Sequence, residues 1–159
     1  MQIVEIKGEQ FYKIENSNTM RPFFMSIVSD SNHWMFISSN GGLTAGRKNA
    51  EFSLFPYYTD DKITESADIT GSKSIFQINF NNEINVWEPF SERFSDNRYS
   101  VSRNLYKNLY GNKIIFEETN HDLQITYRYH WNSSNEYGFV RKSELYNHSE
   151  NAYQIELVD

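Results

Sequence analysis

Apolar and polar residues alternate over most of this 159-residue chain, and a period of two is the pattern of a half-buried strand. The alternation is clearest in the second half, where Leu123, Ile125, Tyr127 and Tyr129 alternate with polar side chains. Turn-forming Asn, Asp, Ser and Gly residues separate the segments. The predicted strands are residues 2–7, 10–15, 23–29, 33–38, 76–80, 84–87, 113–118, 123–130, 138–146 and 153–158.

Two stretches lack this period. Residues 40–71 contain Gly, Pro, Asp and Thr without a clear strand or helix pattern, and a loop of that length in a compact domain is usually functional or disordered. Its aromatic residues favour an ordered excursion that packs on the rest of the domain. Residues 103–110 carry Leu105 and Leu109 at a helical spacing, but the segment is too short for a stable helix. We expect a loop or a single turn there.

The composition favours strands over helices. The chain has 14 Ile, 6 Val and 26 aromatic residues but only 4 Ala. The aromatic side chains supply the buried area of a packed core in spite of the low mean hydropathy. No Cys is present, so packing alone must stabilise the fold. We therefore predict one all-β domain over residues 1–159, an antiparallel β-sandwich.

Charge and hydropathy exclude two classes of partner. The formal net charge is -6 at pH 7 and no dense Lys/Arg cluster offsets it, so the surface repels a phosphate backbone and nucleic acid is not expected. No segment approaches the roughly 20 apolar residues of a membrane span, and the start lacks a signal-peptide pattern. We expect no membrane partner and a cytoplasmic location.

The glycines and histidines do not form a recognisable catalytic or metal-binding motif. Gly41, Gly42 and Gly46 match no phosphate-binding loop. We expect these glycines to allow positive φ angles or a close approach of the backbone. The four histidines lie far apart in the sequence, without the spacing of a zinc site or a His-assisted nucleophile. We expect them at solvent-facing strand positions. The sequence predicts no cofactor and no metal.

The adjacent carboxylates also lack a catalytic arrangement. Glu117 and Glu118 must point to opposite faces of a strand, so they cannot flank one glycosidic bond. Asp60 and Asp61 lie in the long loop, where turn formation is the expected role. We assign no catalytic residue. Trp87 ends a strand before a proline and is expected in the core.

The long loop holds the candidates for a binding surface. Aromatic side chains can stack on the C–H face of a pyranose ring while neighbouring polar groups bond its hydroxyls. The alternative is that these rings only cap the sandwich. The candidate residues for a sugar site or an interface are Arg47, Asn49, Tyr57, Tyr58 and Asp60.

Several short motifs occur in an order that resembles one family of carbohydrate enzymes. They are Gly41-Gly42 followed by Arg47-Lys48-Asn49, the segment Leu54 to Asp61, the segment Val86 to Phe90 around Trp87-Glu88-Pro89, the segment Tyr106 to Phe116 with Gly111, and the segment Lys142 to Ser149. Over roughly residues 35 to 158, this order resembles the amino-terminal domain of inverting disaccharide phosphorylases of the cellobiose phosphorylase type.

The resemblance implies a β supersandwich of the galactose-mutarotase type, which this chain covers in whole or in part. In the family, an (α/α)6 barrel follows and carries the general acid and the phosphate pocket. The last strand still alternates at Asp159, so we expect an N-terminal fragment of a longer enzyme. The implied function is a non-catalytic domain of a glycoside phosphorylase or hydrolase that supports the sugar site and assembly. The implied partners are the C-terminal barrel, an oligosaccharide and a second copy of the chain.

Two other functions stay open. The first is an independent carbohydrate-binding module, which would bind oligosaccharide without any further domain. The second is a mutarotase-like epimerase that uses a His general acid and a Glu base, which only fold analogy suggests.

Overall fold

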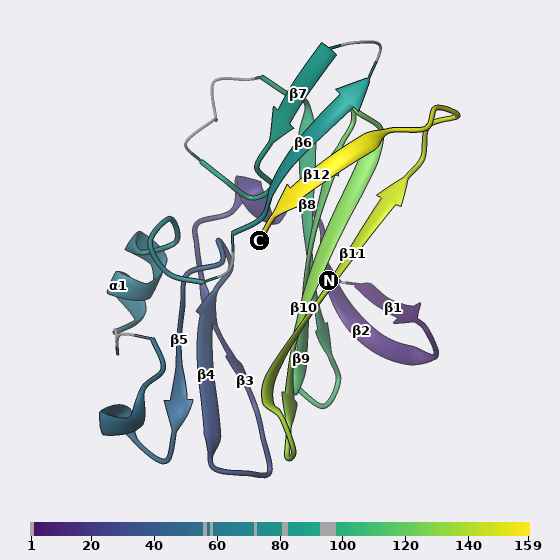
Figure 1. Ribbon diagram of the computed structural model, residues 1–159. Coiled ribbons are helices and arrows are strands. Elements are labelled where there is room, and N and C mark those ends of the chain that lie inside the picture. The colour runs from purple at the N-terminus through teal and green to yellow at the C-terminus, as the bar shows by residue number, and fades with distance from the viewer. Residues whose placement is uncertain (1, 56, 58, 72, 81–82, 93–97) are drawn as a thin grey trace.

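The computed structural model describes residues 2–55, 57, 59–71, 73–80, 83–92 and 98–159. Its main elements are antiparallel strands (Figure 1). The strands are β1 (Gln2–Ile6), β2 (Glu9–Ile14), β3 (Phe24–Ile27), β4 (His33–Ser38), β5 (Leu43–Arg47), β6 (Ile75–Phe80), β7 (Glu83–Trp87), β8 (Val101–Asn108), β9 (Lys113–Asn120), β10 (Ile125–Ser134), β11 (Gly138–Asn147) and β12 (Gln154–Val158). The short helices between them are η1 (Ser17–Thr19), η2 (Ala50–Phe52) and α1 (Asp60–Glu65).

The strands form three antiparallel sheets. One sheet has six strands in the order β1-β2-β8-β9-β10-β11, and the other two have three strands each, in the orders β12-β6-β7 and β3-β4-β5. One hydrophobic core joins residues of all three sheets, with the large sheet on one side and the two small sheets on the other. This arrangement confirms the predicted all-β antiparallel sandwich.

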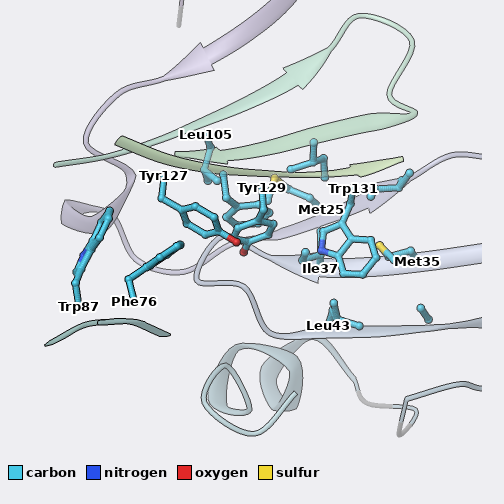
Figure 2. Close-up of a cluster of buried hydrophobic side chains, with 14 of the residues drawn as sticks. Met25, Met35, Ile37, Leu43, Phe76, Trp87, Leu105, Tyr127, Tyr129 and Trp131 are labelled. Carbon is cyan, nitrogen blue, oxygen red and sulfur yellow. The ribbon is translucent and has the colours of Figure 1, made fainter. Parts of the chain in front are cut away.

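Aromatic and sulfur-containing side chains fill the core (Figure 2). The rings of Phe116 and Tyr129 stack with their centroids 4.7 Å apart. From the small sheets, Phe76 and Trp87 lie together with ring centroids 5.5 Å apart. Trp87 is only 2% exposed, which confirms its predicted core position.

The long stretch without a pattern is ordered and packs on the core, as expected, but it also contains a strand and a helix that the sequence did not predict. Strand β5 pairs with β4, and helix α1 lies further along. The first four residues of β5, Leu43 to Gly46, are all buried, because one face meets the core and the other is covered by chain. No exposed polar residue therefore marks the alternation along β5.

Most of residues 103–110 belong to strand β8, and only 109–110 lie in a turn, so the prediction of a loop or a single turn was wrong. Strand β8 lies within the large sheet, between β2 and β9. Leu105 and Tyr106 point to opposite faces of the sheet, yet they are 2% and 5% exposed. Burial on both faces removes the alternation of apolar and polar residues that predicts a strand. The other predicted strands are confirmed, while the predicted turn at 81–82 lies outside the described residues.

The outer face of the large sheet is strongly curved and partly buried. Phe11, Tyr106 and Ile115 form a second, small hydrophobic cluster on this face. Lys7, in the turn between β1 and β2, contacts Glu144 of β11, although these strands lie at opposite edges of the sheet. In the described part of the chain, no helix has the length and apolar character that crossing a membrane requires.

Candidate functional site

Four aromatic rings follow one another across the outer face of the β3-β4-β5 sheet. Phe24 of β3 and Phe36 of β4 stack at a centroid distance of 5.2 Å. Trp34 lies 5.8 Å from Phe36, and Tyr57 meets Trp34 edge-on at 5.8 Å. We call Phe24, Phe36, Trp34 and Tyr57 the aromatic face.

Strand alternation places these rings outside the core. In β4, Met35 and Ile37 are buried in the core, so Trp34 and Phe36 point to the opposite side. Gly46 lies beneath the Trp34 ring, and a Cβ atom there would be only 2.5 Å from Cζ2 of Trp34. This confirms that a close approach requires glycine at position 46.

The aromatic face is open to solvent at its ends. Phe24 is 45% exposed and Tyr57 is 56% exposed. Two further exposed apolar side chains, Phe52 and Leu54, lie in the nearby segment between β5 and α1. Exposed apolar side chains gathered in this way make the region a candidate surface for a ligand or a partner. In the same segment, Phe55 packs against the core instead.

The structure brings two of the five candidate residues to neighbouring positions on β4. Tyr57 contacts Trp34, and the Nε of Arg47 donates a hydrogen bond to Nε2 of His33 over 3.0 Å. Both contacts lie at the end of β4 where His33 pairs with Arg47. By strand alternation His33 and its partner Arg47 share the face of the sheet that Met35 occupies, so only Tyr57 of the five candidates joins the aromatic face.

The other three candidates are not brought into one site by the described contacts. The side chain of Asn49 caps η2, accepting a hydrogen bond from the backbone N–H of Glu51 over 3.1 Å. Asp60 is the first residue of α1, but its side chain lies outside the described residues. Tyr58 also lies outside them.

Sequence reasoning missed most of the aromatic face. Phe24, Trp34 and Phe36 lie in strands that the sequence predicts correctly, but the prediction assigns no role to their outward-facing rings. The signal was present in β4, where large apolar residues occupy both alternating sets of positions. A strand with large apolar residues on both faces has a second apolar surface besides the one in the core.

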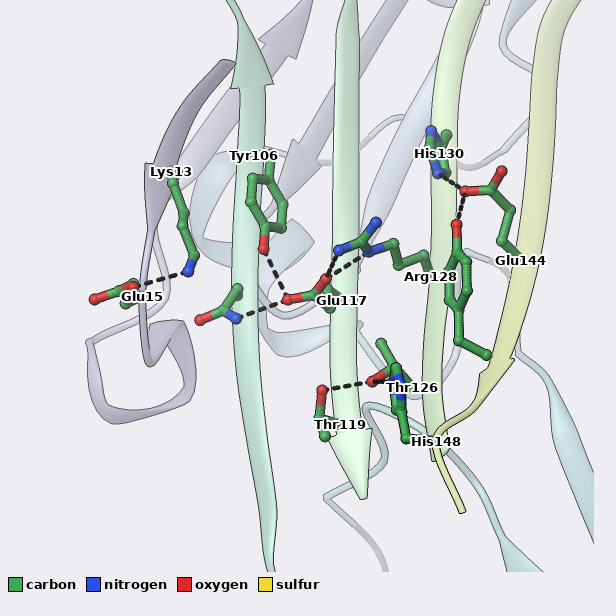
Figure 3. Close-up of polar contacts among 12 residues, drawn as sticks. Lys13, Glu15, Tyr106, Glu117, Thr119, Thr126, Arg128, His130, Glu144 and His148 are labelled. Carbon is green, nitrogen blue, oxygen red and sulfur yellow. Dashed lines mark hydrogen bonds and ion pairs between the residues drawn. The ribbon is translucent and has the colours of Figure 1, made fainter. Parts of the chain in front are cut away.

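The outer face of the large sheet carries a separate polar network (Figure 3). Glu117 accepts hydrogen bonds from Nδ2 of Asn104 and from the Tyr106 hydroxyl, both over 2.7 Å, and it pairs with Arg128. Burial opposes its charged form, but these hydrogen bonds and the Arg128 charge hold the pKa of Glu117 below its usual value. Glu118 points to the other face, which confirms that the two carboxylates cannot act on one bond.

The histidine prediction was wrong for His130, which is 9% exposed and lies on this face. Its Nε2 is 3.1 Å from the Glu144 carboxylate. Burial lowers the pKa of His130, against the opposing effect of Glu144. Sequence spacing could not reveal this pair, because β10 and β11 bring it together across the sheet.

Glu144 is poorly suited to act as a general base. Besides His130, it contacts Lys7, receives a hydrogen bond from Tyr146 over 2.9 Å, and pairs with Lys142 at 2.8 Å. Although burial opposes ionisation, the hydrogen bonds from Lys142, Lys7 and Tyr146 hold its pKa well below the usual range. A carboxylate in this state has little tendency to accept a proton at neutral pH.

Among the described residues, no three His, Cys, Asp or Glu side chains converge as metal ligands would. In comparisons with known proteins, the sequence matches no family model and no curated protein. The resemblance to cellobiose phosphorylases therefore remains a prediction that rests on the motifs in the sequence.

Proposed function

We propose that this chain is a non-catalytic β-sandwich domain of a carbohydrate-active enzyme, and that its aromatic face contacts oligosaccharide. The single observation that carries the proposal is the uninterrupted run of four rings from Phe24 to Tyr57 across the outer face of one sheet. The order of motifs that resembles cellobiose phosphorylases supports the carbohydrate class of ligand.

The chemistry of this surface suits a sugar. Pyranose rings present C–H groups that pack on aromatic side chains, and their hydroxyls need hydrogen-bond partners at the margin. Lys48 is exposed just after β5, and its ammonium lies 5.3 Å from the centre of the Phe52 ring. An exposed apolar ring and an adjacent donor are therefore available in the segment that follows β5.

We propose that, in the parent enzyme, a C-terminal (α/α)6 barrel supplies the catalytic acid. A further proposed role of the sandwich is to form a homodimer. An independent carbohydrate-binding module is the second candidate, and the same aromatic face favours it. The natural reading frame separates the two. Several hundred further residues with amphipathic helices support the accessory domain, whereas a natural stop at Asp159 supports the independent module.

A mutarotase-like reaction is the least favoured function. His130 and Glu144 do lie at hydrogen-bonding distance, so geometry alone does not exclude a proton relay between them. The four donors around Glu144 nevertheless leave it without the basicity that such a reaction needs.

The proposal is tested by titrating the isolated chain with a panel of neutral oligosaccharides, including cello-, xylo- and malto-oligosaccharides. We expect saturable binding, and Tyr57→Ala should weaken it by about twofold to twelvefold, since a lost stacking contact contributes roughly 0.5–1.5 kcal/mol. Tyr137→Ala is the matched control, because Tyr137 is also exposed, at 75%, but lies on the β10–β11 hairpin. Equal loss in both variants, or no binding to any glycan, would contradict the proposal.

A further inference from the structure

A cleft of about 430 Å³ opens on a different part of the molecule, beside β7, β8 and β9. Its volume falls within the range of small-molecule sites, roughly 300–1,000 Å³. The lining residues that matter here are Trp87, Glu88, Glu92, Tyr99, Arg103 and Glu118. None of them belongs to the aromatic face.

The floor of the cleft is a buried and well-ordered polar cluster. Glu118 is 2% exposed and accepts hydrogen bonds from the Trp87 indole N–H over 2.9 Å and from the Phe90 backbone N–H over 2.7 Å. Its second oxygen also receives the Nε–H of Arg103 over 2.6 Å. A buried carboxylate with three donors is fixed in position, so the floor is preorganised.

The segment that follows β7 is held in an unfavourable backbone conformation. Phe90 has a φ of 64°, in the left-handed region that non-glycine residues rarely adopt. The hydrogen bond from its N–H to Glu118 and its ring contact with Phe116 stabilise this conformation. Such local strain concentrates at binding sites, where it is compensated by surrounding structure.

The polar groups of the cleft that are available for hydrogen bonding indicate the class of ligand. Arg103 donates to Glu118 and to the Ser91 carbonyl, which leaves N–H groups of its guanidinium without a partner among the described residues. Within that part of the chain, the carboxylates of Glu88 and Glu92 also have no hydrogen-bond partner, and both line the cleft. The cleft thus offers donors at its floor and acceptors around them.

We propose that this cleft binds a neutral sugar of mono- or disaccharide size. Sugar hydroxyls both donate and accept, so they can satisfy the carboxylates and the guanidinium at the same time. An anionic ligand would meet Glu88 and Glu92, and a cationic ligand would meet Arg103. This site is separate from the aromatic face and does not depend on its function.

The three tryptophans make the proposal directly testable. Trp34 lies in the aromatic face, Trp87 donates to the floor of the cleft, and Trp131 is in the core. In a ¹⁵N-labelled sample of the whole chain, each gives its own indole N–H resonance, assigned by Trp→Phe replacement. Titration uses glucose, galactose, cellobiose and lactose, with glucose 1-phosphate and spermidine as charged probes.

We expect a neutral sugar to shift the Trp87 resonance saturably while Trp131 stays unchanged. Glu88→Gln and Glu92→Gln together should weaken this binding about tenfold, because charge-assisted hydrogen bonds are lost. Glu83→Gln, an exposed position elsewhere, is the matched control. Absence of a Trp87 shift with every neutral sugar would overturn the site, and a shift only with a charged probe would overturn the ligand class. A shift of Trp34 alone would support the aromatic face and overturn the cleft.

Discussion

The ammonium group of Lys7 contacts the carboxylate of Glu144 across the outer face of the six-stranded sheet (Figure 3 shows Glu144). Lys7 lies in the hairpin turn at one edge of the sheet, and Glu144 lies in β11 at the other. The contact is possible because the sheet curves until its two edges approach each other. Glu144 therefore connects strands that are not neighbours in the sheet.

Glu144→Gln should lower the free energy of unfolding by about 1–2 kcal/mol, because the amide cannot replace the charge-assisted hydrogen bonds to the lysines. The Glu144 side chain is 13% exposed, so solvent does not compensate fully. Urea denaturation followed by circular dichroism measures the change. Glu156→Gln on exposed β12 is the control and should stay within about 0.5 kcal/mol.

Acidification below neutral pH should destabilise the fold, because the buried His130 side chain resists protonation. Burial lowers the pKa of folded His130 below the value of 6.5 that an unfolded histidine has. Between these two values the unfolded chain binds a proton that the folded chain does not, so stability rises with pH and falls on acidification. Unfolding free energies at about pH 7.5 and about pH 5.5 should differ in this direction.

His130→Gln should flatten this pH dependence, because the glutamine side chain binds no proton in this pH range. Two charged groups that face His130 are Glu144 and Lys142, and both are retained in the variant. An identical slope in both proteins would mean that His130 is not the group responsible.

Gly46→Ala should disturb both the stability and the aromatic face. The new methyl group would lie 2.5 Å from the Trp34 ring and 2.6 Å from the Phe52 carbonyl oxygen. Overpacking of this kind costs roughly 1–3 kcal/mol and should shift the indole resonance of Trp34. Ser26→Ala, on the same outer side of the sheet, should leave both unchanged. A normal melting temperature for Gly46→Ala would contradict the packing described for β5.

Glu118→Gln should be among the most destabilising single substitutions, at roughly 3 kcal/mol or more, since it removes the 2% exposed carboxylate that pairs with Arg103. The Trp87 indole resonance should move as its acceptor weakens. Glu92→Gln at the exposed margin of the same cleft should stay within about 0.5 kcal/mol. Equal thermal stability of the two variants would contradict the buried role of Glu118.

The sequence predicted strands well where one face meets solvent. β6 and β12 alternate clearly, because their outward positions are polar or exposed. β5 and β8 escaped prediction because both of their faces are covered, so polar residues inside them are not the exposed ones that would mark the period. Leu105 lies in β8 and Leu109 follows it, so their helical spacing was misleading.

The candidate site was predicted only in part. Tyr57 and Arg47 were chosen from the loop, and both meet β4. Trp34 and Phe36 could have been found by asking which residues of β4 point away from the core. The pair of His130 and Glu144 depends on strand register, and the cleft above Glu118 depends on three strands meeting, so neither follows from local sequence.

The most direct test of carbohydrate binding at the aromatic face is the response of the Trp34 indole resonance to neutral oligosaccharides. We expect a saturable shift of Trp34 that Tyr57→Ala weakens and Tyr137→Ala does not, with Trp131 unchanged. If the Trp34 resonance stays fixed with every oligosaccharide tested, the aromatic face is not a carbohydrate-binding surface.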